Sequence, residues 1–393
     1  MLRISIHLII GFSLLILVED AVAQTKVTTT ANCNRSATAI QAAVNAASAG
    51  VPTTITVSGA CRDNVVIPTG KQITLLGASG STLTPASSTT QVIESSGMTT
   101  LDSMNISSTS SDGSGLILAW GGGTLFIKNS DIYVSANANT VIGVWQHSVT
   151  IITNSRIRGV ANQNSTYAVA VQADAGSSLI IKGDPASGAN TFTKSYASQI
   201  QMIGGAASGA MDGIACSGGS SLVIRANSAA VGGNLQDGEV HIDSNGNSDT
   251  SKLNGYGIRL NQCDLKIKNN TPSIANITIS GNSHQGILMF NSTGQILGAT
   301  IQNNGNRDSS EGDGISINMG SLVISQSKIN NNGPSENRND VAVYKNSTVN
   351  FTKWDGTTAP TIVGQLSCAY NGKIIVDNSA ITNTTPTGCF LQP

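Results

Sequence analysis

Charged residues are scarce in this chain. Lys, Arg, Asp and Glu make up 11% of its 393 residues, whereas about 25% is usual in soluble domains. The formal net charge is −1 and the sequence has no basic stripe, so it lacks the cations that would neutralise nucleic-acid phosphates. It also has no Cys-x-x-Cys motif, which argues against redox or zinc chemistry. The composition therefore disfavours nucleic acid as a partner.

Long apolar runs are missing beyond the N-terminus. Arg3, the mostly apolar run 4–18 and the small residues Ala21-Val22-Ala23 are typical of a signal peptide, residues 1–23, with cleavage before Gln24. The run is too short for a confident membrane span, although an uncleaved anchor is the alternative. We therefore expect a secreted protein, extracellular or periplasmic, with no membrane span after signal removal.

The six cysteines are an even number, consistent with an oxidising compartment. Two lie near each end of the chain, and we expect these pairs to staple the ends of the fold. The third pair falls in the middle, at positions offset by about three residues within the repeat described below. The expected pairs are Cys33 with Cys61 and Cys368 with Cys389, and Cys216 with Cys263 is a third pairing that adjacent coils would allow.

An eight-residue phrase recurs along the chain. It has apolar residues at its first, third and eighth positions and a polar pair between them, and it occupies residues 125–132, 150–157, 322–329 and 374–381. Such a phrase predicts stacked coils, in which apolar residues face inward and the polar pair forms a bend. We expect the amides of the bend, Asn129, Asn154, Gln326 and Asn378, to form structural stacks and to bond to the backbone of neighbouring coils.

A second phrase, glycine followed by alternating apolar residues, sets the coil length. It begins at Gly115, Gly213, Gly257, Gly286 and Gly314. The last three glycines are 28 or 29 residues apart, and 44 residues separate Gly213 from Gly257. These intervals are too short for a strand, a helix and a second strand. We predict three short parallel strands per coil, with the longer intervals forming projecting loops.

The segment before the coils has a helical pattern. Thr38-Ala39-Ile40-Gln41 reads as a capping box, and an apolar stripe follows before Gly50 and Pro52. A helix here would cover the open end of the stack. We therefore divide the mature chain into an N-terminal segment with a capping helix, residues 24–53, and one β-helix domain, residues 54–393.

This repeat pattern resembles the right-handed parallel β-helix, or pectin-lyase-like, superfamily over roughly residues 54–389. The resemblance implies an all-β solenoid whose flank lies along an extended glycan. It does not identify an activity, because the superfamily contains lyases, hydrolases, epimerases, tailspikes and adhesins. The motifs of its polygalacturonases are missing, and of the epimerase motif only Asp184-Pro185 remains.

One charged cluster resembles the acidic calcium site of the pectate lyases. Arg307, Asp308, Glu311 and Asp313 precede the strand at Gly314, and Asp340 precedes the corresponding strand one coil later. We expect the two groups to stack, as candidate catalytic residues. Asp313 and Asp340 are tentative calcium ligands, because neighbouring carboxylates need a compensating cation. The alternative is a solvated loop with surface ion pairs.

Three other residues are candidates by position. His284 lies two residues before Gly286, beside the acidic cluster, and is a candidate acid or base, although it is also compatible with an ordinary turn. Trp120 and Trp145 occupy the same place relative to the repeated phrase. We expect them to lie one above the other, either as a substrate-binding platform for sugar rings or as a stack that fills a turn.

These observations lead to two functional hypotheses. The first is a secreted β-helix protein that engages an extended polysaccharide or cell-surface glycan along its flank, with polysaccharide lyase and glycoside hydrolase as the enzyme classes to consider. The second is a non-enzymatic surface or matrix protein, an adhesin or structural rod. The missing catalytic motifs favour the second, whereas the acidic cluster and the paired tryptophans favour glycan engagement. No cofactor is required by either hypothesis, and calcium is the candidate ion.

Overall fold

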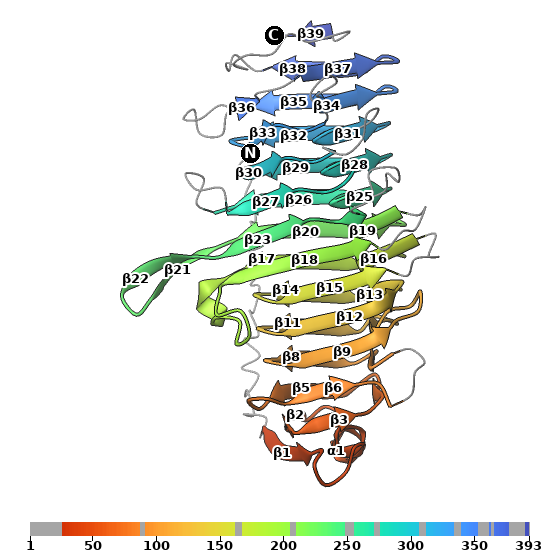
Figure 1. Ribbon diagram of the computed structural model, residues 1–393, viewed down its shortest axis with the longest axis vertical. Helices are drawn as coiled ribbons and strands as arrows, with labels where there is room; N and C mark the ends of the chain where they lie inside the picture. The colour runs from red at the N-terminus through yellow and green to blue at the C-terminus, as the bar shows by residue number, and fades with distance from the viewer. Residues whose placement is uncertain are drawn as a thin grey trace, which may run out of the picture.

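A computed structural model describes residues 26–86, 91–161, 167–204, 210–247, 255–270, 276–305, 312–333, 339–352, 361–362, 365–376 and 390–392. The expected signal peptide lies outside these residues. Within them, the strands stack into a rod whose coils rise from the N-terminal to the C-terminal end (Figure 1).

Three parallel sheets form the walls of the rod. The largest, here sheet A, has 14 strands among the described residues, in the order β1 (Val27–Asn32), β2 (Pro52–Ser58), β5 (Gln72–Gly77), β8 (Met98–Asp102), β11 (Thr124–Lys128), β14 (Val149–Thr153), β17 (Ser178–Gly183), β20 (Ser221–Ala226), β26 (Asp264–Asn269), β29 (Thr293–Leu297), β32 (Ser321–Ser325), β35 (Thr348–Thr352), β38 (Lys373–Val376) and β39 (Phe390–Gln392). Sheet A therefore runs the length of the described rod and starts before residue 54, where we placed the domain boundary.

The second wall, sheet B, comes next in each coil. Its described strands are β3 (Ala60–Arg62), β6 (Thr82–Thr84), β9 (Asn105–Ser110), β12 (Asp131–Ala138), β15 (Arg156–Ala161), β18 (Ala197–Gly204), β23 (Glu239–Asp243), β27 (Ile277–Ser280), β30 (Ala299–Gln302), β33 (Lys328–Asn330) and β36 (Thr361–Ile362), with β24 (Gly246–Asn247) paired to β18.

The third wall, sheet C, completes each coil. Its described strands are β4 (Val65–Ile67), β7 (Ile93–Ser95), β10 (Ile117–Ala119), β13 (Thr140–Val144), β16 (Tyr167–Ala173), β19 (Ala210–Ser217), β25 (Ile258–Asn261), β28 (Ile287–Phe290), β31 (Ile315–Asn318), β34 (Asn339–Tyr344) and β37 (Gln365–Ala369). Consecutive strands of each sheet are parallel and come from successive coils. The fold is therefore the right-handed parallel β-helix, as predicted.

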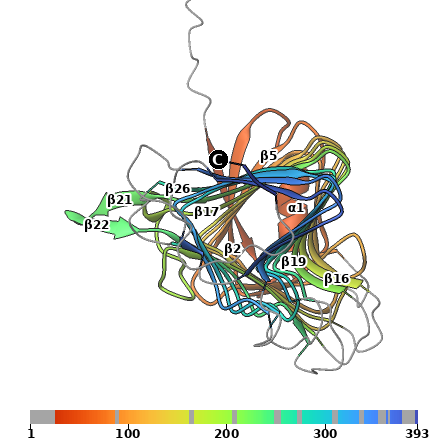
Figure 2. The same ribbon diagram turned by 90° about the horizontal axis from the view of Figure 1, so that it is seen from above.

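The core is the inside of the tube (Figure 2). Along each strand, alternate residues point inward, and the inward residues of successive coils stack in register. Ile127, Ile152, Ile181 and Ile224, for example, pair in turn across sheet A and are all fully buried. Burial of such aliphatic side chains is the main stabilising contribution, about 1.5–3 kcal/mol for each.

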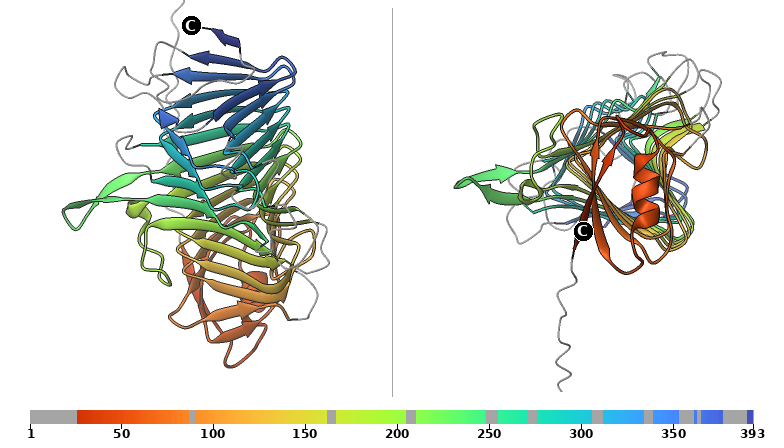
Figure 3. Two further views of the ribbon diagram at one scale, coloured as in Figure 1. Left: turned by 45° about the horizontal axis from the view of Figure 1, so that its top comes forward. Right: turned by 90° about the horizontal axis from the view of Figure 1, so that it is seen from below.

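The helix α1 (Ala39–Ala46) covers the N-terminal end of the tube, as predicted (Figure 3). Ile40 and Val44 are its buried residues. The expected capping box is wrong, because the side chain of Thr38 makes no capping bond. Instead, the backbone N–H of Gln41 donates to Oδ2 of Asp63 at 2.8 Å. Asp63 comes from the first coil, so the helix is capped by the element on which it packs.

The bends of the first repeated phrase have a left-handed backbone. The φ angles are +51° at Asn129, +48° at Asn154 and +45° at Gln326, a conformation that asparagine tolerates better than most residues. Asn154 donates to the carbonyl oxygens of Asp184 and Gly188. Asn129 and Asn154 thus bond to backbone, as expected, but not to each other; Asn378 lies outside the described residues.

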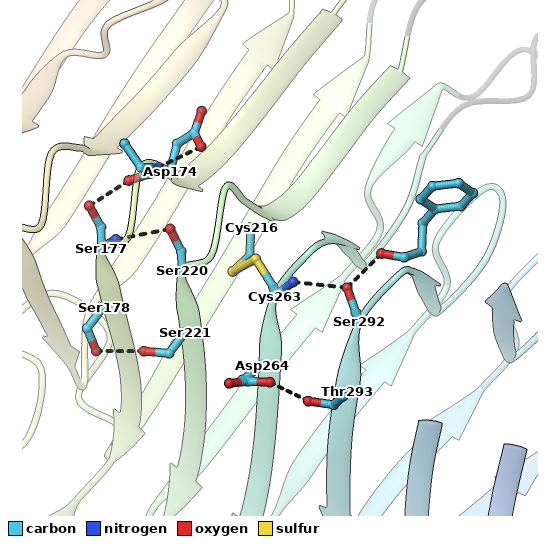
Figure 4. Close-up of a disulfide and its surroundings, with 12 residues drawn as sticks. Asp174, Ser177, Ser178, Cys216, Ser220, Ser221, Cys263, Asp264, Ser292 and Thr293 are labelled. Atoms are coloured by element: carbon cyan, nitrogen blue, oxygen red, sulfur yellow. Dashed lines mark hydrogen bonds between the residues drawn. A yellow bond between two sulfur atoms is a disulfide. The ribbon is translucent and has the colours of Figure 1, made fainter. Parts of the chain in front are cut away.

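Disulfides reinforce the rod. Cys33 is bonded to Cys61 and Cys216 to Cys263, as predicted. The second bridge joins the end of a sheet C strand to the start of a sheet A strand one coil later (Figure 4). Cys368 is also disulfide-bonded, and its expected partner Cys389 lies outside the described residues.

The long interval after Gly213 forms a projecting hairpin, as predicted for extra loop length. Its antiparallel strands are β21 (Ser228–Val231) and β22 (Asn234–Asp237), which extend away from the rod (Figure 1). The 3-10 helix η1 (Pro185–Ser187) belongs to a neighbouring loop. Among the described residues, no helix is both long and apolar enough to cross a membrane.

Candidate functional site: a cavity on the outer face of sheet C

A ladder of buried amides runs behind the site, in the turns that lead into sheet C. Nδ2 of Asn245 donates to Oδ1 of Asn282 at 2.7 Å, Asn282 to Asn304 at 2.7 Å, and Asn304 to Asn332 at 2.9 Å. Asn332 in turn donates to Oδ1 of Asp340 at 2.8 Å. All five side chains are buried. We call this row the asparagine ladder.

The ladder explains the recurring glycine of the second phrase. A Cβ atom on Gly286 would lie 2.7 Å from Nδ2 of Asn304, and one on Gly314 would lie 2.5 Å from Nδ2 of Asn332. Real Cβ atoms do not approach other atoms so closely, so only glycine leaves room for the amides. The glycines and the ladder together hold the backbone that precedes each sheet C strand.

The residues next to those glycines open into a cavity of about 790 Å³. Its walls are three rows of residues from successive coils. The first row lies just before the glycine positions and consists of Tyr256, Gln285, Asp313 and Asn339. The second row lies on the strands and consists of Gln172, Ala215, Arg259, Leu288 and Ser316. The third row lies two residues further along the strands and consists of Ser217, Asn261, Phe290, Asn318 and Tyr344. Because successive coils are about 4.8 Å apart, the cavity is elongated along the rod.

Arg259 is the cation of this cavity. It is one of the outward residues of β25, and its side chain is 35% exposed. Its Nε lies 2.8 Å from Oδ2 of Asp212, a residue with no solvent exposure. Its Cζ lies 4.7 Å from the ring centroid of Tyr167, within the range of a cation–π contact. The guanidinium is thus fixed between a buried carboxylate and an aromatic ring while one side stays open.

Burial dominates the electrostatics of these groups. It raises the pKa of Asp212 to about 7, although the charge of Arg259 opposes the shift. Burial also raises the pKa of the Tyr167 hydroxyl, and the charge of Asp212 adds to this effect. For Arg259, burial is the largest influence and works against the charged form, but the charge of Asp212 together with Tyr167 and Tyr256 outweighs it, so the pKa is raised. The guanidinium therefore stays charged while its partner carboxyl titrates near neutral pH.

An aromatic pair lies beside this cation. The rings of Tyr256 and His284 have centroids 4.9 Å apart and are tilted by 49°, and the Tyr256 ring lies 6.0 Å from Cζ of Arg259. Both side chains line the cavity. The predicted candidate His284 is therefore placed in the same cavity as an arginine and a tyrosine, groups that bind anions and transfer protons.

The predicted acidic cluster is divided. Asp313 lines the cavity, whereas Asp340 ends the asparagine ladder and is fully buried. The register of β31 and β34 places Asp340 beside Gly314 and not beside Asp313. Arg307, Asp308 and Glu311 lie outside the described residues. Within the described part of the chain, no group of three His, Cys, Asp or Glu side chains is arranged to hold a metal ion.

The tryptophans lie on the same flank. Trp120 and Trp145 follow Ala119 and Val144, which are paired in adjacent strands, so the indoles occupy neighbouring positions of one row as predicted. Among the described residues, the rings in contact are those of Tyr256 and His284, and the two indoles are not such a pair. The same row continues through Asp174 and Ser217 to Phe290 and Tyr344 of the cavity. With an exposed fraction of 38%, Trp120 is open to solvent.

Four residues of the cavity were not among the predicted site residues: Asp212, Tyr167, Tyr256 and Arg259. A signal for three of them was available. Asp212 and Tyr256 directly precede phrase glycines, in the position that Gln285 and Asp313 occupy in later coils, and Arg259 is the only charged residue inside a glycine phrase. Tyr167 had no such mark, because it lies outside both phrases.

Comparison with known proteins adds little to this picture. No protein-family model matches the chain, and no curated protein matches its sequence. Among solved structures, the chain is similar to an alginate lyase from Paenibacillus sp. str. FPU-7, with 12% identity over 94% of this chain and 98% of that chain and a TM-score of 0.33. It is also similar to pectate lyase Pel9A, with 15% identity over 94% of this chain and 80% of that chain and a TM-score of 0.29. These likenesses concern the fold alone.

Proposed function

We propose that the protein is secreted and binds an extended acidic polysaccharide in the cavity on sheet C, with Arg259 as the group that contacts a sugar carboxylate. The observation that carries this proposal is the position of Arg259, charged, half-buried and fixed by Asp212 and Tyr167 at the centre of an elongated cavity. The disulfides support export to an oxidising compartment.

The row of outward residues supports a chain-like ligand. It runs from the indoles of Trp120 and Trp145, past the carboxylate of Asp174 and the polar residues Ser217 and Asn261, to Phe290 and Tyr344. Aromatic faces suit the apolar faces of sugar rings, and the coil spacing allows successive sugars to meet successive coils. The two tryptophans then extend the binding surface beyond the cavity.

If the protein is an enzyme, these groups suit a lyase better than a hydrolase. Hydrolysis needs two carboxyl groups at the scissile bond, and of the described residues that line the cavity only Asp313 carries one. In elimination, a base takes the proton from the carbon next to the carboxylate, a carbon–carbon double bond forms, and the glycosidic oxygen leaves with a proton. Arg259 would neutralise the carboxylate, while His284 and Tyr256 would transfer the protons.

The test is incubation with a panel of acidic polysaccharides, with and without calcium. Elimination appears as ultraviolet absorbance of an unsaturated product, and hydrolysis as new reducing ends without that absorbance. Arg259→Gln should lower turnover of an acidic glycan by about 100-fold or more, as expected for the loss of a charged contact to the developing negative charge. Arg62→Gln, which removes an exposed arginine from sheet B, is the matched control.

The second candidate function is a glycan-binding rod without catalysis, because the sequence lacks the polygalacturonase motifs and all but Asp184-Pro185 of the epimerase motif. Product formation on none of the panel, with binding that still depends on Arg259, would establish this alternative. Binding and turnover that are both unchanged in Arg259→Gln would refute the assignment of the cavity.

A further inference from the structure

The outer face of sheet A carries three parallel rows of side chains near the middle of the rod. The first row is polar and consists of Ser178, Ser221, Asp264 and Thr293, which pair in register across four coils. Ser221 and Ser178 are hydrogen-bonded at 3.1 Å, and Thr293 is hydrogen-bonded to Asp264 (Figure 4). The row therefore presents hydroxyl groups, with one carboxylate among them.

The second row is largely aliphatic. Two residues further along the same strands, Ile151, Ile180 and Val223 pair in register and are partly exposed, and Lys266 follows them. The residue before Ile151 in this row is Phe126 of β11, which is also partly exposed. The row forms an apolar strip between the polar row and the row described next.

The third row, here called the cationic row, consists of Lys182, Arg225 and Lys268. The three residues pair in register on adjacent strands, so their Cα atoms follow one another at about 4.8 Å. Arg225 and Lys268 are exposed and Lys182 is half-buried. Among the described residues, the ion pairs involve other side chains, and none includes a member of this row.

Such an arrangement is unfavourable by itself. Like charges directly opposite each other on a sheet destabilise it, and the chain has only 21 Lys and Arg residues in all. Three of them stand side by side here, with Lys266 on the next row. A repeated anion would relieve this repulsion, because each cation would then face an opposite charge.

We propose that the outer face of sheet A is a second, non-catalytic binding track for an acidic polysaccharide that lies along the rod. The cationic row meets the carboxylate or sulfate groups, the aliphatic row meets the apolar faces of the sugar rings, and the hydroxyl row bonds to sugar hydroxyls. This face lies outside the cavity on sheet C, and the three rows run side by side across successive strands, so the track follows the polymer from coil to coil.

The chemistry of the face favours this ligand over other polyanions. Single-stranded nucleic acid is held largely by stacking of successive bases on aromatic side chains. Beside the cationic row the second row carries Ile180, Val223 and Lys266, and Phe126 lies two strands before Ile180. A lipid surface requires apolar side chains that protrude into it, whereas Ile151, Ile180 and Val223 are only partly exposed. A glycan needs neither feature.

The test compares a row variant with a control of equal charge. The row variant is Lys182→Gln, Arg225→Gln and Lys268→Gln; the control is Arg35→Gln, Lys328→Gln and Lys345→Gln, which removes three exposed cations located elsewhere. Binding is measured by electrophoresis in gels that contain alginate, polygalacturonate or neutral dextran, at low and high salt. Circular dichroism and thermal unfolding confirm that each variant is folded.

We expect the row variant to bind at least one of the two acidic polymers about tenfold more weakly than the control does, and to lose most of the salt dependence of binding. Equal binding of both polymers by the row variant and the control would overturn the proposal. So would a row-dependent affinity for anionic lipid vesicles or single-stranded DNA without one for the acidic polymers.

The track on sheet A and the cavity on sheet C would bind the same class of ligand at different sites. The variant Arg259→Gln distinguishes the two sites. If the row variant loses affinity for the polymer while Arg259→Gln does not, the track is supported and the cavity assignment fails. If only Arg259→Gln loses affinity, the track is refuted and the cavity assignment stands.

Discussion

The outer faces of sheets A and C are built from the same coils but treat their cations in opposite ways. On sheet C, Arg259 is held 2.8 Å from the buried carboxylate of Asp212 and lies over the ring of Tyr167. On sheet A, Arg225 stands exposed between Lys182 and Lys268. A fixed cation suits recognition of one group in a defined place, whereas a row of cations without carboxylate partners suits a repeating polymer.

The two faces also differ in what lies behind them. The turns that lead into sheet C contain the asparagine ladder, which fixes each backbone segment next to the cavity. The turns that lead into sheet A contain hydroxyl ladders, in which the backbone N–H of Ser177 donates to Oγ of Ser220 and that of Cys263 to Oγ of Ser292 (Figure 4). In the asparagine ladder each amide side chain donates to the next side chain, whereas these hydroxyls accept from the backbone of the neighbouring coil.

The largest effect on stability should come from Gly286→Ala, which disturbs the ladder behind sheet C. The added Cβ would lie 2.7 Å from both Nδ2 of Asn304 and the carbonyl oxygen of Gly314, so the ladder must shift. We expect the free energy of unfolding to fall by about 2–4 kcal/mol, as measured by urea denaturation. Gly113→Ala is the control, since a Cβ there meets no atom within 4 Å. Equal losses in the two variants would mean that the ladder does not fix the cavity wall.

A smaller effect is expected at the end of the ladder. Asp340→Leu removes the acceptor of the Nδ2 and backbone N–H of Asn332 and should cost about 1–3 kcal/mol, because two buried donors lose their partner. Asp340→Asn keeps an oxygen in the same place and should cost less. Both are measured by thermal or urea unfolding, with and without calcium. A calcium-dependent stability that Asp340→Asn abolishes would favour the metal-site prediction over the ladder role.

The sequence was sufficient to predict the rod, because apolar alternation and a recurring bend act locally in every coil. Ile127 and Ile152 are recognisable as core residues from their place in the phrase, and the disulfides Cys33–Cys61 and Cys216–Cys263 follow from which coils are neighbours. The prediction of Trp145 beside Trp120 succeeded for the same reason. Register is a property of the repeat, so it can be read from spacing.

The site was harder to predict, because it depends on the direction in which residues of similar composition point. Asp313 lies two residues before β31, whereas Asp340 is the second residue of β34 and is level with Gly314. This shift of one residue places the first in the cavity wall and the second in the ladder. The pairing of Asp212 with Arg259 joins positions on adjacent coils that are not in register. Spacing alone does not reveal such diagonal contacts.

The smallest effect, and the sharpest distinction between the two faces, should be the response to pH. Burial raises the pKa of Asp212 to about 7, so this carboxyl loses its charge as the pH falls through that value. Arg259 then loses its counter-charge, and an acidic glycan in the cavity should bind about two- to tenfold more tightly. The cationic row has no such carboxyl partner among the described residues, so binding on sheet A should not change in this range. Affinity for an acidic oligosaccharide, measured from about pH 8 to about pH 6 in the row variant, isolates the cavity.

The free energy of unfolding should also be greater at low pH, as glycan affinity is. The folded-state pKa of Asp212 lies above the value of about 3.9 expected in the unfolded chain, so the stabilising contribution of the neutral carboxyl is fully present below about pH 4 and is lost as the pH rises through about 7. Asp212→Asn should remove both this decline in melting temperature and the pH dependence of binding, whereas the control Glu94→Gln should retain them. If Asp212→Asn bound the glycan with the wild-type pH profile, some other group would control the charge of the cavity, and the contrast with sheet A would no longer rest on the Asp212–Arg259 pair.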